Sequence, residues 1–279
     1  MNARGWLGRL ELRYRRDGER SVAHDRHEGP LRVLRALYPE GPQICHHVLV
    51  HPPGGVVGGD RLEVDAQWGP GSRALITTPG ATRFYRCEGA AARQAVRLRL
   101  EGGACAEWLP LENIAYPGCD AVNELRFELA PGAELIGWDL LALGLPEAGA
   151  PFVQGRYAQH LEWPGHWLER ATLDATDRVL LDGPLGLDGQ RALATLWFAA
   201  ADGWPAGRVD ALLDAARQLA DGERAVVTAG ASAPQRGLVV LRALAPRIEP
   251  VQGLLRAVHA AWRRIGWGLE GEMPRIWRT

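Results

Sequence analysis

The sequence predicts a mainly β fold of many short strands, followed by a smaller C-terminal part that contains two helices. Glycine and proline account for 34 and 19 of the 279 residues, an excess that favours tight turns over long helices. Apolar and polar residues alternate repeatedly between residue 6 and about residue 175, which is typical of half-buried strands. Helical spacing of apolar residues occurs only in the final third.

The alternation is clearest in three segments. In residues 6–15, apolar side chains and Gly8 occupy every second position, and from residue 9 on arginine or glutamate occupies the positions between them. Residues 96–101 and 124–129 repeat this pattern, which places one face of each strand in a core. Turn sequences such as Asp17-Gly18 and Pro131-Gly132 separate the predicted strands.

Two helices are predicted in the final third. The first carries apolar residues from 212 to 219 and ends at Asp221-Gly222. The second carries an apolar stripe from 254 to 265, begins just after Pro250 and ends at Gly266.

Short strands are expected between the helices, at 225–228 and 238–241. No linker or low-complexity run divides the chain. We therefore expect one unit over residues 1–279, with a β-rich body over 1–205 and a helix-containing part over 206–279.

Composition excludes several classes of function. The net charge of −1 argues against a nucleic-acid partner, because phosphate binding needs a basic surplus. All 32 basic residues are arginine, and the absence of lysine excludes Schiff-base catalysis and a Walker A loop. No segment reads as a signal peptide or membrane span, and the four cysteines form no Cys-x-x-Cys pair. We expect a cytoplasmic protein with reduced thiols and no membrane partner.

Residues 45–60 are the densest chemical segment. On a strand, Cys45 and His47 share one face with His51, and thiol and imidazole groups suit nickel or zinc. The plainer alternative is that Cys45 and His47 pack in the core. Glycine pairs follow, which permit unusual backbone angles or a close approach. Asp60 comes directly after them, and its plainer role is that of a turn residue.

Three carboxylates lie in apolar surroundings, namely Glu107, Asp139 and Glu169. A buried charge must be paired, hydrogen-bonded or hydrated, since burying it alone costs several kcal/mol. Pairing with arginine is one interpretation for these residues. The other is that they line a polar cavity or passage.

The motifs resemble those of the UreD (UreH) family of urease accessory proteins, in the expected order from residue 6 to the C-terminus. The most specific match is His51–Asp60, His-Pro-Pro-Gly-Gly-Val-Val-Gly-Gly-Asp. The other matching segments are Arg26–Arg32, Leu37–Gly41, Thr77–Thr82, Phe84–Arg86, Glu107–Pro110, Gly137–Asp139 and Pro274–Trp277.

The chain departs from the family pattern in two places. Arg83 stands where the family usually has lysine, and Ala142 and Gly144-Leu145 stand where it typically has a cysteine and Gly-Arg. These departures weaken any claim that a cysteine or a basic residue is needed there.

The resemblance implies a protein without catalytic activity, with an irregular β-helix-like body. It implies direct binding to the helical accessory protein UreF, indirect binding to the GTPase UreG, and nickel insertion into the urease apoprotein. No tightly bound cofactor is expected, and Ni(II) is a transient cargo.

A cation that passes through a protein needs sites weak enough to release it. We expect Asp60, Thr82, Asp139 and Glu169 to face an internal hydrated route, with Cys45 and His47 as weaker candidates.

A second prediction concerns partner contacts of the C-terminal helix and tail, because tryptophan and arginine often anchor interfaces. The residues are Trp262, Arg263, Arg264, Trp267, Arg275, Trp277 and Arg278. The alternative is that Trp262 belongs to the core and the tail packs down.

Two enzymatic alternatives stay open. One is a polysaccharide-acting enzyme with paired carboxylates about 5–10 Å apart and exposed tryptophan platforms. The other is a zinc-dependent hydrolase that uses His46, His47 and His51.

Overall fold

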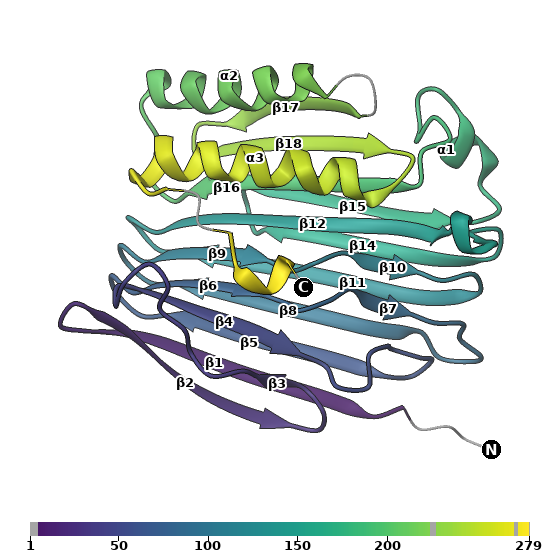
Figure 1. The fold of residues 1–279 in the computed structure, drawn as a ribbon, viewed down its shortest axis with the longest axis horizontal. Coiled ribbons are helices and arrows are strands. Elements are labelled where there is room, and N and C mark those ends of the chain that lie inside the picture. The colour runs from purple at the N-terminus through teal and green to yellow at the C-terminus, as the bar shows by residue number, and fades with distance from the viewer. Residues whose placement is uncertain (1–4, 224–226, 271–272, 279) are drawn as a thin grey trace.

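The computed structural model describes residues 5–223, 227–270 and 273–278. Two β-sheets lie face to face, and helices cover the outer face of one of them (Figure 1). Within the described residues, the first sheet has seven strands and the second has eleven. The predicted mainly β fold with C-terminal helices is confirmed.

The first sheet has the strand order β15 (Trp167–Asp174), β14 (Gly155–Trp163), β11 (Cys119–Leu129), β8 (Ala92–Leu100), β5 (Arg61–Trp68), β1 (Leu7–Asp17) and β2 (Arg20–Glu28). The second has the order β17 (Thr228–Gln235), β18 (Leu238–Ala245), β16 (Ala192–Ala200), β12 (Glu134–Leu145), β9 (Cys105–Leu109), β6 (Arg73–Thr77), β4 (Ile44–Val50) and β3 (Arg32–Val33). Short strands β7 (Thr82–Phe84), β10 (Asn113–Ala115) and β13 (Ala150–Pro151) complete the second sheet.

The chain winds like a β-helix. Neighbouring strands from β1 through β5, β8 and β11 to β14 are parallel, as are β4, β6, β9 and β12. Parallel pairing requires a crossover between strands, and here the crossover is a strand of the opposite sheet. The β-helix-like body implied by the resemblance is therefore observed.

The glycine-rich loop at 51–60 forms one corner of this winding. Gly54 and Gly59 have φ values of 76° and 86°, which side chains with a Cβ adopt at a cost. A Cβ on Gly55 would lie 2.1 Å from the ring of Tyr85. The glycines thus serve the turn and a close approach of this chain to itself.

Strand alternation divides the interior into two cores. On β12, Leu135, Leu141 and Leu143 point between the two sheets, whereas Ile136 and Leu140 point toward the helices. A strand buried on both faces explains why the segment around Asp139 is almost continuously apolar.

Helices α2 (Ala206–Gly222) and α3 (Ile248–Trp267) pack on the second sheet (Figure 1). The structure starts α3 at Ile248, two residues before Pro250 and not after it as predicted. A proline is tolerated in the first helical turn, where the backbone N–H groups have no intrahelical partner. No helix of the described residues is long and apolar enough to span a membrane.

Three shorter helices are α1 (Arg178–Asp182), η1 (Pro146–Ala148) and η2 (Arg275–Arg278). The strand expected at 238–241 is part of β18. β17 starts at Thr228, the last residue of the strand expected at 225–228, and residues 225 and 226 of that prediction lie outside the described residues.

Candidate functional site

Asp139 lies between the two sheets and is buried on β12. Its Oδ1 accepts hydrogen bonds from Asn123 Nδ2 at 2.9 Å and Asn113 Nδ2 at 3.4 Å, and Gln159 Nε2 donates to Oδ2. Among the described residues no arginine pairs with Asp139, so the arginine interpretation is wrong here. Burial, together with the negative charge of Glu169, raises the pKa of Asp139 to about 7, against the opposing effect of the amides.

Two of the amide partners of Asp139, Asn123 and Gln159, belong to a row of polar side chains between the sheets. Gln94, Asn123 and Gln159 occupy aligned positions on β8, β11 and β14 and point between the sheets. Gln94 Nε2 donates to Asn123 Oδ1 at 3.1 Å, and Asn123 donates to Asp139. We call Gln94, Asn123, Asp139 and Gln159 the polar row. The sequence analysis did not identify the three amides of this row as site residues. The available signal was that each amide occupies a position where the alternation of its strand predicts an apolar residue.

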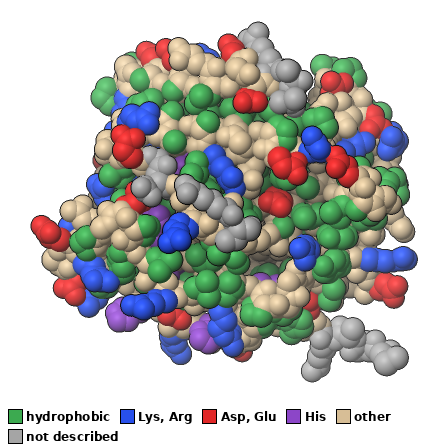
Figure 2. All heavy atoms as spheres, viewed as in Figure 1, with side chains coloured by type: hydrophobic (Ala, Val, Ile, Leu, Met, Phe, Trp, Pro, Cys, Tyr) green, Lys and Arg blue, Asp and Glu red, His purple; other side chains and the backbone are tan. Residues whose placement is uncertain are grey.

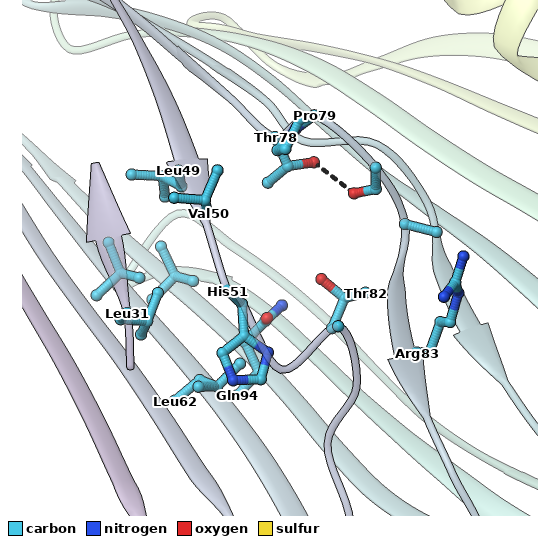
Figure 3. A pocket seen from close by; sticks show the side chains of 15 residues that line it. Leu31, Leu49, Val50, His51, Leu62, Thr78, Pro79, Thr82, Arg83 and Gln94 are labelled. Carbon is cyan, nitrogen blue, oxygen red and sulfur yellow. Dashed lines mark hydrogen bonds between the residues drawn. The ribbon is translucent and has the colours of Figure 1, made fainter. Parts of the chain in front are cut away.

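One end of the polar row opens into a pocket of about 280 Å³, the His51 pocket (Figure 3). Gln94 and His51 both line it, and the hydroxyl of Thr82 points into it. His51 Nε2 is buried without a hydrogen-bond partner among the described residues. Burial lowers the pKa of His51, so its ring is neutral at pH 7.

The other end opens into a second pocket, of about 490 Å³, the Asp139 pocket. It lies between β15, the last strand of the first sheet, and β16, β17 and β18 of the second. Its polar lining includes Asp139, Gln159, Glu169, Thr195 and Arg242.

Glu169 forms an ion pair with an arginine, which is one of the two interpretations given for the carboxylates in apolar surroundings. Arg242 Nη2 donates to Glu169 Oε1, and Thr195 Oγ1 donates to Oε2 at 3.4 Å. Glu169 also lines the Asp139 pocket, so both interpretations of this carboxylate apply.

Polar atoms without protein partners occur next to the polar row. Tyr157 Oη and Trp197 Nε1 are buried between the sheets, and neither has a hydrogen-bond partner within the described part of the chain. Buried polar groups of this kind are usually satisfied by ordered water. Two buried polar atoms between the sheets thus lack a partner in the described part of the chain.

Cys45 and His47 lie away from this row. They share the inner face of β4, as predicted, but β6 and β9 separate β4 from β12. His47 Nδ1 is hydrogen-bonded to Tyr14 Oη at 2.8 Å, and burial lowers the pKa of His47 to about 4. Burial also raises the pKa of Cys45 to about 11. Neither residue lines the two pockets, and core packing describes both.

Asp60 serves the glycine-rich turn. Its Oδ1 accepts from the backbone N–H of Trp6 at 3.2 Å, and its Oδ2 accepts from that of Val57 at 3.1 Å. The side chain is buried and does not line either pocket. Of the expected route residues, Thr82, Asp139 and Glu169 line the pockets, and Asp60 holds the turn.

The zinc-hydrolase alternative is wrong. His46 points to the opposite side of β4 from His47, and its Nε2 is 2.7 Å from Glu40 Oε1. His51 lines its own pocket. The described residues contain no group of three or more His, Cys, Asp or Glu side chains arranged to hold a metal ion.

The polysaccharide alternative lacks its binding surface. Every tryptophan in the described ranges is buried or half-buried, so none offers an exposed platform for a sugar ring. Asp139 and Glu169 share a pocket, but Asp139 is held by three amides.

The C-terminal residues fall into two groups. Trp262 and Arg263 are fully buried and cannot contact a partner in this conformation. Trp262 belongs to the core beneath α3, where its Nε1 donates to the carbonyl of Leu212 at 2.9 Å. Trp267 and Trp277 are half-buried against the same core, so the packing alternative describes all three tryptophans.

Arg264 and Arg275 are exposed. The side chain of Arg278 lies outside the described residues. Contact of these arginines with a partner stays a prediction.

Glu107 is the third buried carboxylate, and it faces the helices. Its Oε2 lies 2.6 Å from His259 Nε2 and 3.2 Å from Arg263 Nε. Arg263 Nη2 also donates to Glu40 Oε2 at 2.8 Å. Burial alone would raise the pKa of Glu107, but His259 and Arg263 together hold it below its usual value.

Comparison with known proteins identifies the family of this chain. The family described as UreD urease accessory protein matches residues 7–278. The chain belongs to the UreD family. It is 62% identical to the urease accessory protein UreD of Leptothrix cholodnii over 276 residues, covering 98% of this chain and 99% of that protein. It is 54% identical over 272 residues to the protein of the same name from Paracidovorax citrulli, again covering 98% and 99%. The UreD family is named for an accessory role in urease maturation, not for an enzymatic activity.

Proposed function

We propose that this UreD protein is a non-catalytic scaffold and metallochaperone for nickel insertion into urease. It binds a UreF homologue directly and the GTPase UreG through it, and the assembly acts on the urease apoprotein in the cytoplasm. Ni(II) is its cargo and passes through the polar interior. Without lysine or a phosphate-binding loop, the chain leaves nucleotide hydrolysis to a partner.

The observation that carries this proposal is the polar row between two pockets. Gln94 lines the His51 pocket, Gln159 and Asp139 line the Asp139 pocket, and Asn123 joins the two by hydrogen bonds. An interior built only for stability would place apolar side chains at these positions, because unpaired buried polar atoms cost free energy. The row is therefore best explained by something polar that moves along it.

The ligands of the row suit transient passage. Amide and carboxylate oxygens and water bind Ni(II) less tightly than a cage of thiolates and imidazoles. Conduction requires each site to release the ion as readily as it accepts it. Asp139, with its pKa at about 7, can give up its proton to a cation near neutral pH, and Glu169 lines the same pocket as a second carboxylate.

Activation of urease tests the route. We expect Asp139→Asn and Glu169→Gln to lower urease activation by about tenfold at limiting nickel, with less effect at excess nickel. Glu162→Gln is the matched control, because Glu162 lies on β14 and carries its charge on the outer face, beside His160. Capture of the UreF homologue, UreG and urease by each variant separates loss of the route from loss of the complex. If both variants activated urease like wild type and captured the partners normally, the proposed route through these carboxylates would be wrong.

Partner binding is tested at the exposed arginines. The face with α2, α3 and η2 carries acidic and basic side chains interspersed with hydrophobic ones (Figure 2). Such a mixed surface suits a protein partner, in which arginine often anchors the contact. We expect the double variant Arg264→Glu and Arg275→Glu to weaken capture of the UreF homologue, whereas Arg97→Glu, on the outer face of the first sheet, does not. Equal capture by all three proteins would place the contact elsewhere.

A further inference from the structure

The ion pair between Arg242 and Glu169 stands at the edge of the Asp139 pocket. Arg242 belongs to β18, and its side chain is about half exposed, whereas that of Glu169 is one-fifth exposed. Glu169 Oε1 accepts from Arg242, and Oε2 accepts from Thr195. Both oxygens of the carboxylate are therefore occupied by groups of this chain.

The guanidinium of Arg242 supplies a positive charge in the pocket that contains the carboxylates of Glu169 and Asp139. This guanidinium is always charged and lies on Glu169, and the negative charge of Glu169 acts on Asp139. Among the described residues, Arg242 is the only cation that lines this pocket. A divalent cation that binds Glu169 comes close to the guanidinium on Oε1, and the repulsion between the two positive charges sets them in competition for the carboxylate.

The fold leaves space into which Arg242 can move. Gly230 pairs with Arg242 on the neighbouring strand β17 and lines the same pocket. A Cβ built on Gly230 would meet nothing within 4 Å. β17 is an edge strand, and Thr228, Gly230 and Ser232 on this face are exposed. An arginine side chain anchored on β18 has open volume on this side.

We infer that Arg242 is the gate of the Asp139 pocket, neutralising Glu169 in the absence of a cation and moving toward Gly230 when a divalent cation enters. The gate rests on the proposed function, since it assumes that Asp139 and Glu169 take up the ion. Its effect is to lower the affinity of the pocket, because part of the binding free energy is spent on displacing the guanidinium. A lower affinity favours release to the next site.

The gate is tested with the full-length chain and Ni²⁺ alone, by equilibrium dialysis. We expect Arg242→Ala to bind Ni²⁺ about tenfold more tightly than wild type, and Arg242→Lys to bind like wild type, since it keeps the charge. Adding Glu169→Gln to Arg242→Ala should abolish the gain. Unchanged urea midpoints would show that the variants fold, as expected for the loss of a half-exposed ion pair.

Gly230 provides an independent test of the movement. We expect Gly230→Val to slow Ni²⁺ uptake in stopped-flow measurements by about tenfold when Arg242 is present, and to have no effect in the Arg242→Ala background. Valine is well suited to a strand, so the backbone of β17 is preserved.

Two results would overturn the inference, for different reasons. If Arg242→Ala bound Ni²⁺ with the affinity of wild type while Glu169→Gln bound it more weakly, Arg242 would not be a gate. The Asp139 pocket would still be a site for the ion. If Arg242→Ala, Glu169→Gln and Asp139→Asn all bound Ni²⁺ like wild type, the Asp139 pocket would not be part of the nickel route. The proposed role of Arg242 as a gate would then also be wrong.

Discussion

Arg263 of α3 lies with its Nε 3.2 Å from the carboxylate of Glu107 on β9, and its side chain is fully buried. The same guanidinium donates to Glu40 Oε2, and Glu40 and Glu107 are each in contact with a histidine. A charge network of this kind fixes α3 on the second sheet, because each member would be costly to bury without the others.

Removing Arg263 should destabilise the protein strongly. We expect Arg263→Met to lower the free energy of unfolding by about 3–5 kcal/mol, because it leaves the carboxylates of Glu40 and Glu107 buried without a cation. Arg264→Ala, at the next and exposed position, should change it by less than about 0.5 kcal/mol. Urea unfolding followed by tryptophan fluorescence measures both. A loss below about 1 kcal/mol for Arg263→Met would mean that the network contributes little.

The raised pKa of Asp139 predicts a cost in stability at neutral and higher pH. Its pKa is about 7 in the folded protein, above the ordinary value of 3.8 that applies when the chain is unfolded. The folded state therefore holds the proton more tightly, and ionising Asp139 destabilises the fold as pH rises from 4 through 7. The full effect is up to about 4 kcal/mol, at about 1.4 kcal/mol per pKa unit.

Asp139→Asn removes this ionisation. We expect the variant to be more stable than wild type at pH 8 and to lose that advantage at pH 5, as measured by urea unfolding at the two pH values. Asp65→Asn, which removes a partly exposed carboxylate paired with Arg13 and Arg99, should show no such gain at pH 8. A variant less stable than wild type at pH 8 would mean that the ionised carboxylate is better solvated than its burial implies. A gain in stability with loss of urease activation would show that the charge is kept for function.

Much of the architecture follows from strand alternation, and the polar row shows where that reasoning stops. The pattern at 96–101 and 124–129 predicts β8 and β11 with the correct inward faces. It does not predict which strands become neighbours, so the alignment of Gln94 with Asn123 is visible only in three dimensions. Parallel register joins positions that no local sequence signal connects.

Buried carboxylates show the same limit. Apolar surroundings identify Glu107, Asp139 and Glu169, but the sequence does not reveal that the first two face opposite sides of the second sheet. Their partners come from distant elements, an arginine of α3 for Glu107 and amides of β10, β11 and β14 for Asp139. The interface prediction for Trp262 and Arg263 was wrong because an amphipathic stripe does not distinguish a core contact from a partner contact.

The lowered pKa of His47 predicts that the protein loses stability in acid. Burial lowers its pKa to about 4 from the ordinary 6.5, so the unfolded chain takes up the proton first as pH falls. The stability contributed by neutral His47 is complete above pH 6.5 and is lost as pH falls toward 4, a total of about 3 kcal/mol. His47→Gln should reduce the difference in unfolding free energy between pH 7 and pH 4.5. His24→Gln is the control, because His24 is exposed on β2. An unchanged difference for His47→Gln would assign the acid sensitivity to other groups.

Gly137 lies on β12, two residues before Asp139, and its lack of a side chain lets the strand pack closely against the ring of Trp197. A Cβ at this position would lie 2.4 Å from Trp197 Cζ2, and the ring stacks on Phe127 in the core between the sheets, with little freedom to move. We therefore expect Gly137→Ala to lower the free energy of unfolding by about 1–3 kcal/mol, the usual cost of overpacking a core.

The same substitution tests whether the route depends on the position of Asp139. A shift of β12 at Gly137 moves the carboxylate relative to Asn123 and Gln159, so urease activation should fall along with stability. Gly253→Ala is the matched control, since its Cβ meets nothing and alanine is favoured over glycine within α3 by about 0.5–1 kcal/mol. Adding Trp197→Phe to Gly137→Ala should recover part of both losses, because the smaller ring gives back the space. Recovery of stability without recovery of activation would mean that Trp197 itself, whose Nε1 has no partner within the described residues, takes part in the proposed route.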